Sequence, residues 1–279
     1  MAHWKDNLLL KVINIVTFLL FTGANSYGAL PPFFEPQHYT YLSPEPWIYG
    51  VWGIIHTLLI GLLFYQFTEI GYHTIIEGVG WRFPLLAILT AVYGGLSNSS
   101  SHDHTFSFVL SILAFVTILF VGATVSHIYR SIKIHHPPKT LLDTIFVHIP
   151  FSLFHGFSVV LIFVAGFAAF GVDASSHPAG LFTKAFVFIA LLLLEGTAAA
   201  YVFAGRGDVV GAAVISLSLL AIFQRQSIGR SGHFIHYSAL AFFIISLIAV
   251  LRATIAAFSG SSRITGARAT DEERAPLVG

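Results

Sequence analysis

Glu195 is the residue whose position in the sequence says most about chemistry. It stands inside the apolar run 191–201, between Leu194 and Gly196. A carboxyl group at that depth in a bilayer is costly, so we expect it to face other helices and to have a partner there. Because no Lys or Arg is placed deep in an apolar segment, histidine is the expected partner. Two interpretations stay open: a proton or cation relay or ligand acceptor, and a protonated glutamate that bonds a neighbouring helix for packing.

Tryptophan and histidine supply the other candidate groups. Trp52 and His56 are four residues apart, so a helix places them on one face, where a flat ligand stacks on the indole and hydrogen-bonds the imidazole. The alternative for the tryptophans is an aromatic belt that anchors helix ends at the membrane interface. His148 and His155 are seven residues apart, two turns on one face, and paired histidines on facing helices ligate haem in some proteins. The candidate ligand-binding residues are Trp47, Trp52, His56, His148, His155 and Glu195.

The sequence indicates no other chemistry. It contains no cysteine, so it has no thiolate metal site and no cysteine nucleophile. Nothing resembles a nucleophile triad, a phosphate-binding loop or a pair of catalytic carboxylates. We therefore expect a protein that is not an enzyme, with no catalytic residues, no cofactor and no metal. The formal net charge of +1 also argues against a nucleic-acid surface, which needs a basic excess on one face.

Composition places these residues in a membrane. Hydrophobic residues make up 56% of the 279, charged residues 10%, and the mean hydropathy is +0.80. Soluble domains carry about 25% charged residues because their surface faces water. A chain this poor in charge cannot cover a soluble surface, so we expect a multi-pass membrane protein whose partner is the lipid bilayer. Which membrane holds it is left open by the sequence.

The elements that position the candidate residues are expected to be transmembrane helices of roughly 20 apolar residues each. The fold class is therefore all-α, a polytopic bundle of about eight helices, over residues 1–258, with a disordered cytoplasmic tail over 259–279. The third and seventh segments are short. The eight segments are 8–30, 47–67, 83–96, 105–129, 145–170, 181–204, 209–223 and 234–258.

Lys and Arg predict the orientation. With the N-terminus inside, eleven of the 14 fall in inner loops, and only Lys184, Arg225 and Arg230 fall outside. Both ends are therefore predicted to be cytoplasmic. Arg225 and Arg230 lie on the unfavoured side, which makes segment seven the weakest of the eight. The first segment also has the alternative of a cleaved signal peptide, because Lys5 precedes an apolar run, although Lys11 interrupts that run.

Two stretches resemble a known family. Residues 44–56 (PEPWIYGVWGIIH) are similar to the proline-then-tryptophan entry of helix two in the tryptophan-rich sensory protein, or translocator protein, family. Residues 148–157 (HIPFSLFHGF) resemble a Pro-Phe-Ser-aromatic motif in longer bacterial relatives. The layout, with Gly80-Trp81-Arg82-Phe83, is most similar to an uncharacterised fungal multi-pass family, a domain of unknown function. The chain departs from translocator proteins in having eight expected helices against five, and Phe157 where relatives carry Trp.

The resemblance implies a related bundle, and with the polar residues it favours one function over two others. The first is binding or transport of a small apolar or amphipathic molecule, sterol-like or porphyrin-like, within the bundle. The second is a structural or assembly subunit of a membrane complex with no ligand. The third is a haem-bearing redox protein. A homo-oligomer is compatible with each of the three.

Overall fold

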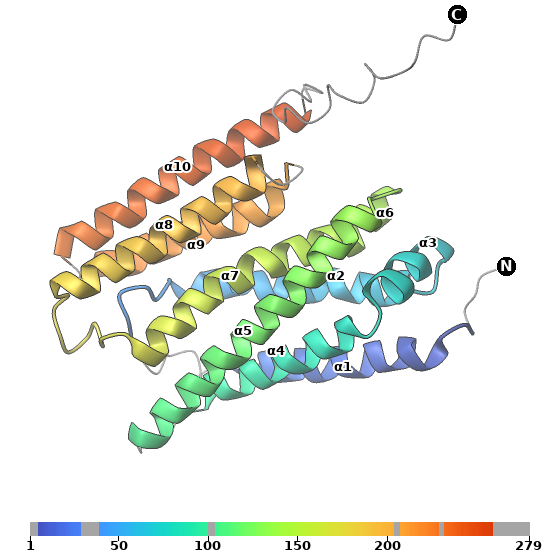
Figure 1. The fold of residues 1–279 in the computed structure, drawn as a ribbon, viewed down its shortest axis with the longest axis horizontal. Helices are drawn as coiled ribbons and strands as arrows, with labels where there is room; N and C mark the ends of the chain where they lie inside the picture. The colour runs from blue at the N-terminus through green and yellow to red at the C-terminus, as the bar shows by residue number, and fades with distance from the viewer. Residues whose placement is uncertain (1–4, 29–38, 100–103, 204–206, 229–231, 259–279) are drawn as a thin grey trace, which may run out of the picture.

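The chain folds into a bundle of long helices, seen in a computed structural model that describes residues 5–28, 39–99, 104–203, 207–228 and 232–258 (Figure 1). The predicted tail 259–279 and Arg230 lie outside these ranges. The elements are α1 (Leu8–Gly28), the 3-10 helix η1 (Pro46–Gly50), α2 (Val51–Tyr65), α3 (Glu69–Gly71), the π-helix η2 (Tyr72–Val79), α4 (Arg82–Asn98), α5 (His104–His135), α6 (Leu141–Asp143), the π-helix η3 (Thr144–His148), α7 (Ile149–Phe170), α8 (Leu181–Phe203), α9 (Val209–Ile228) and α10 (Gly232–Phe258).

Seven helices in the described part of the chain are long and apolar enough to cross a bilayer. They correspond to every predicted segment except the third. That segment, α4, reaches span length only together with the residues before it, Glu69–Val79, and the two pieces are bent by 67°. Gly80 sits at the bend with φ +59, a left-handed conformation that glycine adopts without a Cβ clash. The count is therefore seven, or eight if the bent pair makes one span.

The seventh segment, the weakest of the eight by its loop charges, is long and apolar enough to span. Helix α9 is 20 residues long and continuous, and Val209–Gln226 within it qualifies as a span. Arg225, which counted against it, has partners at its own end of the bundle: its Nη1 is 3.7 Å from Glu45 Oε1, and its guanidinium lies 4.9 Å from the ring centre of Tyr39. A local acid and an aromatic ring thus accommodate a basic residue on the side that the loop charges disfavour.

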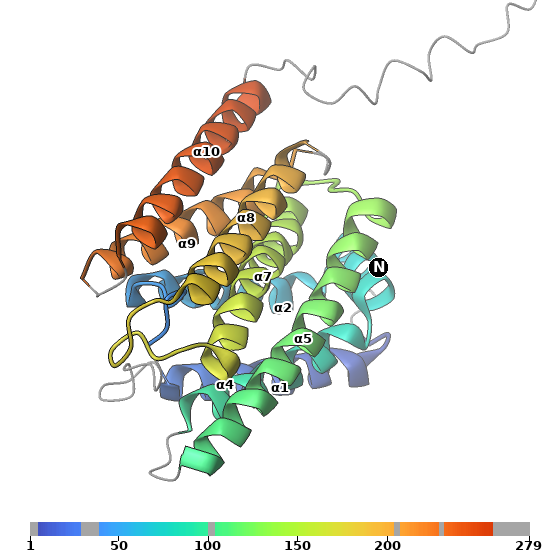
Figure 2. The same cartoon turned by 60° about the vertical axis from the view of Figure 1, so that its left-hand side comes forward.

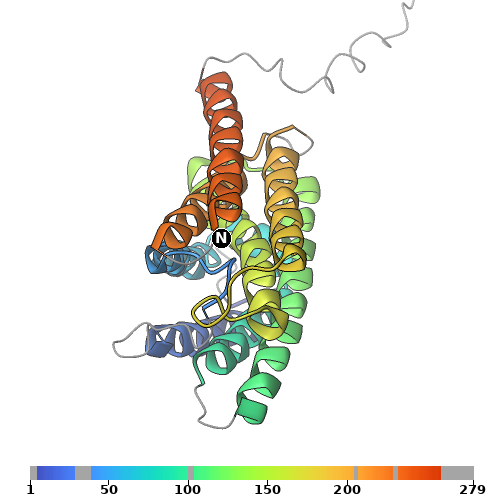
Figure 3. The ribbon, with the colours of Figure 1, turned by 90° about the vertical axis from the view of Figure 1, so that its left-hand side faces the viewer.

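The helices form two groups joined by a middle layer. Helices α8, α9 and α10 pack on one another at one side, and α1 packs along α4 at the opposite side (Figures 1 and 2). Helix α7 lies between them and contacts α5, α9 and α2. The view of Figure 3 shows the same separation, with α10 far from α1. The first turns of α1 and the short helices α3 and α6 lie toward one end of the bundle, which we call the basic end because Lys11, Lys133 and Lys139 belong to it (Figure 1).

At the basic end, two hydrogen bonds between side chains and backbone N–H groups stabilise the short helix α6, which leads into α7. Thr140 Oγ1 accepts a hydrogen bond from the Asp143 backbone N–H at 3.1 Å, and Asp143 Oδ2 accepts one from the Lys139 N–H at 3.2 Å. The following residues take π-helical geometry up to His148, just before Pro150. Proline lacks an N–H and is tolerated in the first turn of a helix. The chain is therefore irregular just before Pro150, where it makes a π-helical turn.

Candidate functional site

Trp52 and His56 lie together as their spacing predicts, with ring centroids 6.0 Å apart. They belong to what we call the aromatic cluster, a set of rings where α1, α2 and α7 meet. Phe21 of α1 is 4.4 Å from His56 and 5.6 Å from Trp52, and Phe154 of α7 is 5.2 Å from Trp52. The cluster comprises Phe18, Phe21, Tyr49, Trp52, His56, Phe154 and Phe157.

His56 is the polar member of the aromatic cluster. It sits near the middle of the span Pro46–Tyr65. Its Nε2 is shielded from solvent and has no hydrogen-bond partner among the described residues. A buried nitrogen without a partner is unusual, because leaving a polar group unpaired in an apolar environment costs free energy. On the same helix, Gly53 is exposed and a Cβ added to it would meet nothing within 4 Å, so one side of α2 is open toward lipid.

Trp47 and His148 lie elsewhere. Trp47 is 46% exposed and donates from Nε1 to Gln224 Oε1 at 2.8 Å, a contact between η1 and α9 at the end of the bundle opposite the basic end. That position fits the aromatic-belt interpretation. His148 is buried in the π-helix η3, and its Nε2 is 3.9 Å from Asp143 Oδ2. The charges of Lys133 and Asp208 also act on His148, so it lies near the same ion pair that His155 faces.

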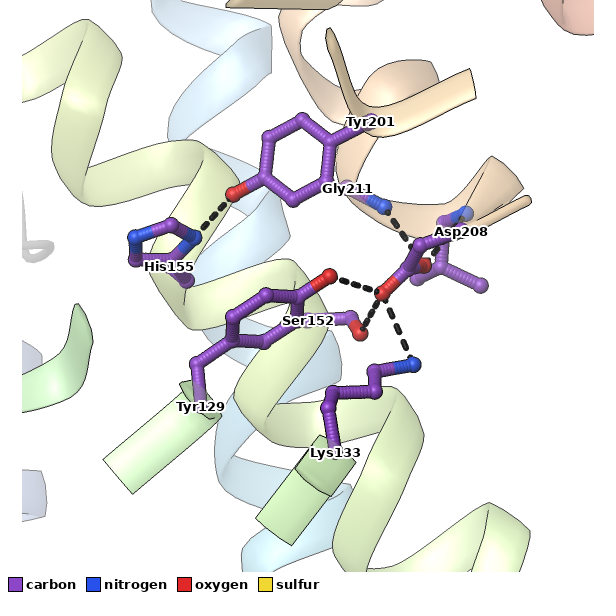
Figure 4. A network of polar contacts seen from close by, with 8 residues as sticks. Tyr129, Lys133, Ser152, His155, Tyr201, Asp208 and Gly211 are labelled. Atoms are coloured by element: carbon purple, nitrogen blue, oxygen red, sulfur yellow. Dashed lines mark hydrogen bonds and ion pairs between the residues drawn. The ribbon is translucent and has the colours of Figure 1, made fainter. Parts of the chain in front are cut away.

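His155 belongs to a network of polar contacts that the sequence did not predict (Figure 4). Its Nε2 is 2.8 Å from Ser126 Oγ of α5, its Nδ1 bonds the hydroxyl of Tyr201 of α8, and its ring stacks on Tyr129 of α5 with centroids 4.7 Å apart. Thus α5, α7 and α8 are tied together through one imidazole. We call Ser126, Tyr129, Lys133, Ser152, His155, Tyr201 and Asp208 the polar network.

Asp208 is the acceptor at the centre of the polar network. Its Oδ2 accepts from Tyr129 Oη at 2.8 Å and from the hydroxyl of Ser152, and it lies 2.9 Å from the ammonium of Lys133. Its Oδ1 faces the first backbone N–H groups of α9, those of Val210 and Gly211, at 3.2 and 3.3 Å. Asp208 is therefore both the N-cap of α9 and the anion that five donors share.

The charge of Asp208 is stabilised by these donors. Burial disfavours the ionised carboxyl, but the Lys133 ammonium and the hydrogen bonds from Ser152, Lys133 and Tyr129 outweigh it, so the pKa of Asp208 lies below its ordinary value of 3.8. Lys133 keeps 26% of its side chain exposed, so the network reaches the surface at the basic end. The arrangement is that of a satisfied ion pair linking α5, α7 and α9.

Two glycines allow this close packing. A Cβ at Gly156 would lie 2.7 Å from the carbonyl oxygen of Gly211, so α7 and α9 touch through their backbones, as small residues allow. A Cβ at Gly211 would lie 2.5 Å from the ring of Tyr201. Any larger residue at either position would push apart the helices that carry His155, Tyr201 and Asp208.

Glu195 faces into the group of α8, α9 and α10, as the sequence predicts, but its partner is serine and not histidine. The residue is 8% exposed, its Oε2 has no hydrogen-bond partner among the described residues, and Ser246 of α10 is the polar side chain that acts on its carboxyl. Ser246 in turn donates to Ser216 Oγ of α9 at 2.9 Å. The six candidate residues thus fall into separate places. Trp52 and His56 come together in one cluster, and His148 and His155 both lie near Asp208, whereas Trp47 and Glu195 each have other neighbours.

The surface grooves of the molecule lie away from the aromatic cluster and from the polar network. One apolar groove of about 420 Å³ opens between α8 and α10, beside Phe188 and Phe242, and another of about 400 Å³ opens near Ala168. Neither is lined by a residue of the aromatic cluster or the polar network. Within the described ranges, no three His, Cys, Asp or Glu side chains are grouped so as to hold a metal ion.

The long apolar helices, with their polar groups turned toward one another, define a multi-pass helical membrane protein. The chain belongs to the TSPO-like protein family, because the sequence model of that family matches residues 9–252. This confirms the resemblance to the translocator protein family. The fungal affiliation stays a prediction. No curated protein matches the chain. No solved structure matches it either.

Sequence reasoning missed most of the polar network. Lys133 was taken only as an orientation signal, and Tyr129, Ser152 and Tyr201 show no pattern that sets them apart. Asp208 carries a usable signal, because it stands directly before an apolar helix, where Asp is a preferred N-cap. Its partners come from α5 and α7, and that proximity depends on tertiary packing.

Proposed function

We propose that this protein binds a small, largely apolar molecule with one hydrogen-bonding group, and that the molecule docks at the aromatic cluster. The observation that carries the proposal is the shielded Nε2 of His56, which has no partner in the described part of the chain although rings of Phe18, Phe21 and Trp52 surround it. A hydroxyl or carboxyl on the ligand would satisfy this nitrogen in a medium without competing water.

The aromatic rings of the cluster support a flat ligand, sterol-like or porphyrin-like, because such a ligand can stack on them. Trp52 and His56 are partly exposed, whereas Phe21 and Phe154 behind them are 1% exposed. A ligand from the bilayer would approach past Gly53, which is exposed, and would stack on Trp52 after the ring of Phe21 turns aside. Membership of the TSPO-like family supports the same class of ligand. The role is non-enzymatic in this proposal, with binding or transport as the outcome.

The test is binding of a fluorescent sterol and of a porphyrin to the full chain in lipid nanodiscs. We expect His56→Phe to weaken binding about five- to tenfold, the value of one hydrogen bond of about 1 kcal/mol. His127→Phe is the matched control, because His127 is an exposed histidine of α5 outside the aromatic cluster and should leave affinity unchanged. Equal binding by both variants, or no binding of either probe by the wild type, would overturn the proposal.

Two alternatives give distinct results in the same preparation. A structural or assembly subunit would bind neither probe and would co-purify with a stoichiometric partner. A haem protein would show a Soret band that shifts on reduction. An absorbance spectrum of the purified chain therefore separates the third function from the first two before any binding is measured.

A further inference from the structure

A second buried polar contact lies between α1 and α2, away from the polar network. Asn14 Nδ2 donates a hydrogen bond to Oε1 of Gln66, the C-cap residue of α2, at 3.0 Å, and both side chains are 0% exposed. Asn14 belongs to the second turn of the span Leu8–Ser26, near the basic end. The bond therefore ties α1 to α2 inside the bundle, and we call these two side chains the amide pair.

The amide pair leaves one nitrogen and one oxygen without a partner. Asn14 Oδ1 and Gln66 Nε2 are shielded from solvent and have no hydrogen-bond partner in the described part of the chain. Turning both amides over does not change this count, because a bond from Gln66 Nε2 to Asn14 Oδ1 leaves Asn14 Nδ2 and Gln66 Oε1 unbonded instead. Since buried polar groups are normally paired, the amide pair calls for a group that both accepts and donates.

The surroundings of the amide pair restrict the chemistry of that group. Lys11, one turn before Asn14 on the same face of α1, is buried and holds its ammonium 5.3 and 5.1 Å from the ring centres of Phe67 and Tyr72. Because Phe67 directly follows Gln66, this positive charge lies beside the amide pair and disfavours an amine. A carboxylate or a ketone only accepts, so it would leave the amide oxygen unpaired. A hydroxyl both accepts and donates, and therefore fits.

Helix α1 connects the amide pair to the aromatic cluster. Asn14, Phe18 and Phe21 are spaced by four and three residues, which puts them on one face of the helix, and all three are buried. Phe18 and Phe21 flank His56, with ring centroids 6.1 and 4.4 Å away. At 1.5 Å per residue, Asn14 is about 6–10 Å from these rings along the helix axis. The amide pair and the unpartnered Nε2 of His56 thus lie beside the same face of α1, at different depths in the membrane.

We propose that the amide pair is a second subsite for the ligand of the aromatic cluster, and that it binds a hydroxyl group. The hydroxyl oxygen accepts from the unbonded amide N–H and donates to the unbonded amide oxygen. The substrate class is then a rigid, apolar molecule that lies along α1 with a hydrogen-bonding group at each end, one at His56 and one at the amide pair. This inference rests on the proposed function, because it takes the aromatic cluster as the place where the apolar body binds.

Two steroids that differ by one hydroxyl test the subsite in the full chain in nanodiscs. Androstanol has a hydroxyl at one end of its ring system, and androstanediol has one at each end. Displacement of the fluorescent sterol gives the affinity of each, and the ratio of diol to mono-alcohol is the quantity compared. We expect this ratio to fall about five- to tenfold, the value of one hydrogen bond, when Asn14→Leu is combined with Gln66→Met.

The double variant replaces both amides by apolar side chains of similar size, so no buried amide is left unpaired and the fold should persist. Asn25→Leu is the matched control, because Asn25 also belongs to α1 but its amide bonds the Phe21 carbonyl oxygen of its own helix at 2.9 Å. It should leave the ratio unchanged. A ratio that the double variant does not lower would refute the subsite and leave the proposed function standing. Failure of androstanol to displace the fluorescent sterol would refute both.

Infrared difference spectra test the direction of the new bond. The carbonyl stretch of an unbonded side-chain amide should move to lower frequency when androstanediol binds to the wild type, because the amide oxygen then accepts a hydrogen bond. The double variant, which lacks both amides, should show no such change. A wild-type spectrum without the downward shift would overturn the assignment of a donating hydroxyl.

Discussion

Replacing Asp208 by asparagine should destabilise the bundle far more than a loss of one charge suggests. Every neighbour of this carboxylate donates, three side chains to Oδ2 and two backbone N–H groups to Oδ1. An amide has only one oxygen, so whichever way the new side chain turns, its NH₂ group faces donors. The variant loses either the cap of α9 or the bonds from α5 and α7.

The expected loss of stability combines the broken ion pair with the misplaced amide group. Breaking a buried ion pair costs about 3–5 kcal/mol, and Lys133 is partly exposed, which lowers that figure because its ammonium can turn to water. Adding the misplaced amide gives a loss of about 2–4 kcal/mol for Asp208→Asn. Lys133→Met leaves the Asp208 carboxylate, 5% exposed, with four donors and no counter-ion, so it should cost about 2 kcal/mol.

The assay is unfolding in mixed micelles by increasing SDS, followed by far-ultraviolet circular dichroism. Asp143→Asn is the matched control, because Asp143 is 1% exposed at the same end, has one bond from Lys139 and leaves Oδ1 without a partner among the described residues. An amide oxygen can keep that bond, so the control should stay within about 1 kcal/mol of wild type. Asp208→Asn equal to the control would refute the role of the shared acceptor.

The same variant has a pH signature. The pKa of Asp208 is lower in the folded chain than its ordinary value of 3.8, so its stabilisation is complete above that value and is lost as pH falls through the folded pKa. Wild type should therefore lose stability in strongly acidic solution, and Asp208→Asn should lose less over the same interval. Parallel acid profiles would contradict the low pKa.

Two further substitutions test the packing around the network. Tyr201→Phe removes the hydroxyl that bonds His155 and should cost about 1 kcal/mol in the same SDS titration, whereas Tyr237→Phe, on an exposed tyrosine, should cost nothing measurable. Gly156→Val brings side-chain carbons against Gly211 and should lower thermal stability by about 1–3 kcal/mol, measured by loss of the monodisperse peak after heating, with Gly95→Val as the unobstructed control.

Helix positions were predictable because a span is a local property. A run of about twenty apolar residues that crosses lipid must be helical, because its backbone groups have no water to bond. The predicted segment 181–204, for example, corresponds to the helix α8, Leu181–Phe203. The third segment failed this logic because Gly80 permits a left-handed turn that bends the chain, and hydropathy does not report a bend. Arg225 counted against the seventh segment for a related reason. Counting Lys and Arg in the loops does not reveal that Glu45 and Tyr39 lie beside Arg225.

The candidate site was predictable only where its residues share one helix. Trp52 and His56 met because four residues make about one turn. The bond between His155 and Tyr201 joins two helices 46 residues apart in sequence, and no periodicity encodes it. Glu195 was correctly placed inside the bundle, since the cost of a buried acid does not depend on the identity of its partner, but the choice of serine over histidine depends on which helices pack against α8.

Helix α7 links the aromatic cluster to the polar network, which limits the routes by which the proposed ligand could enter. Phe154 and His155 are successive residues, about 100° apart around the helix, and they face α2 and α5 respectively. Displacing Phe154 by moving α7 would break the bonds of His155 and open the close contact at Gly156. Phe21 belongs to α1, which packs chiefly on α4 and contributes no residue to the polar network. Entry by rotation of Phe21 is therefore the lower-cost route, and α1 rather than α7 is the helix expected to move.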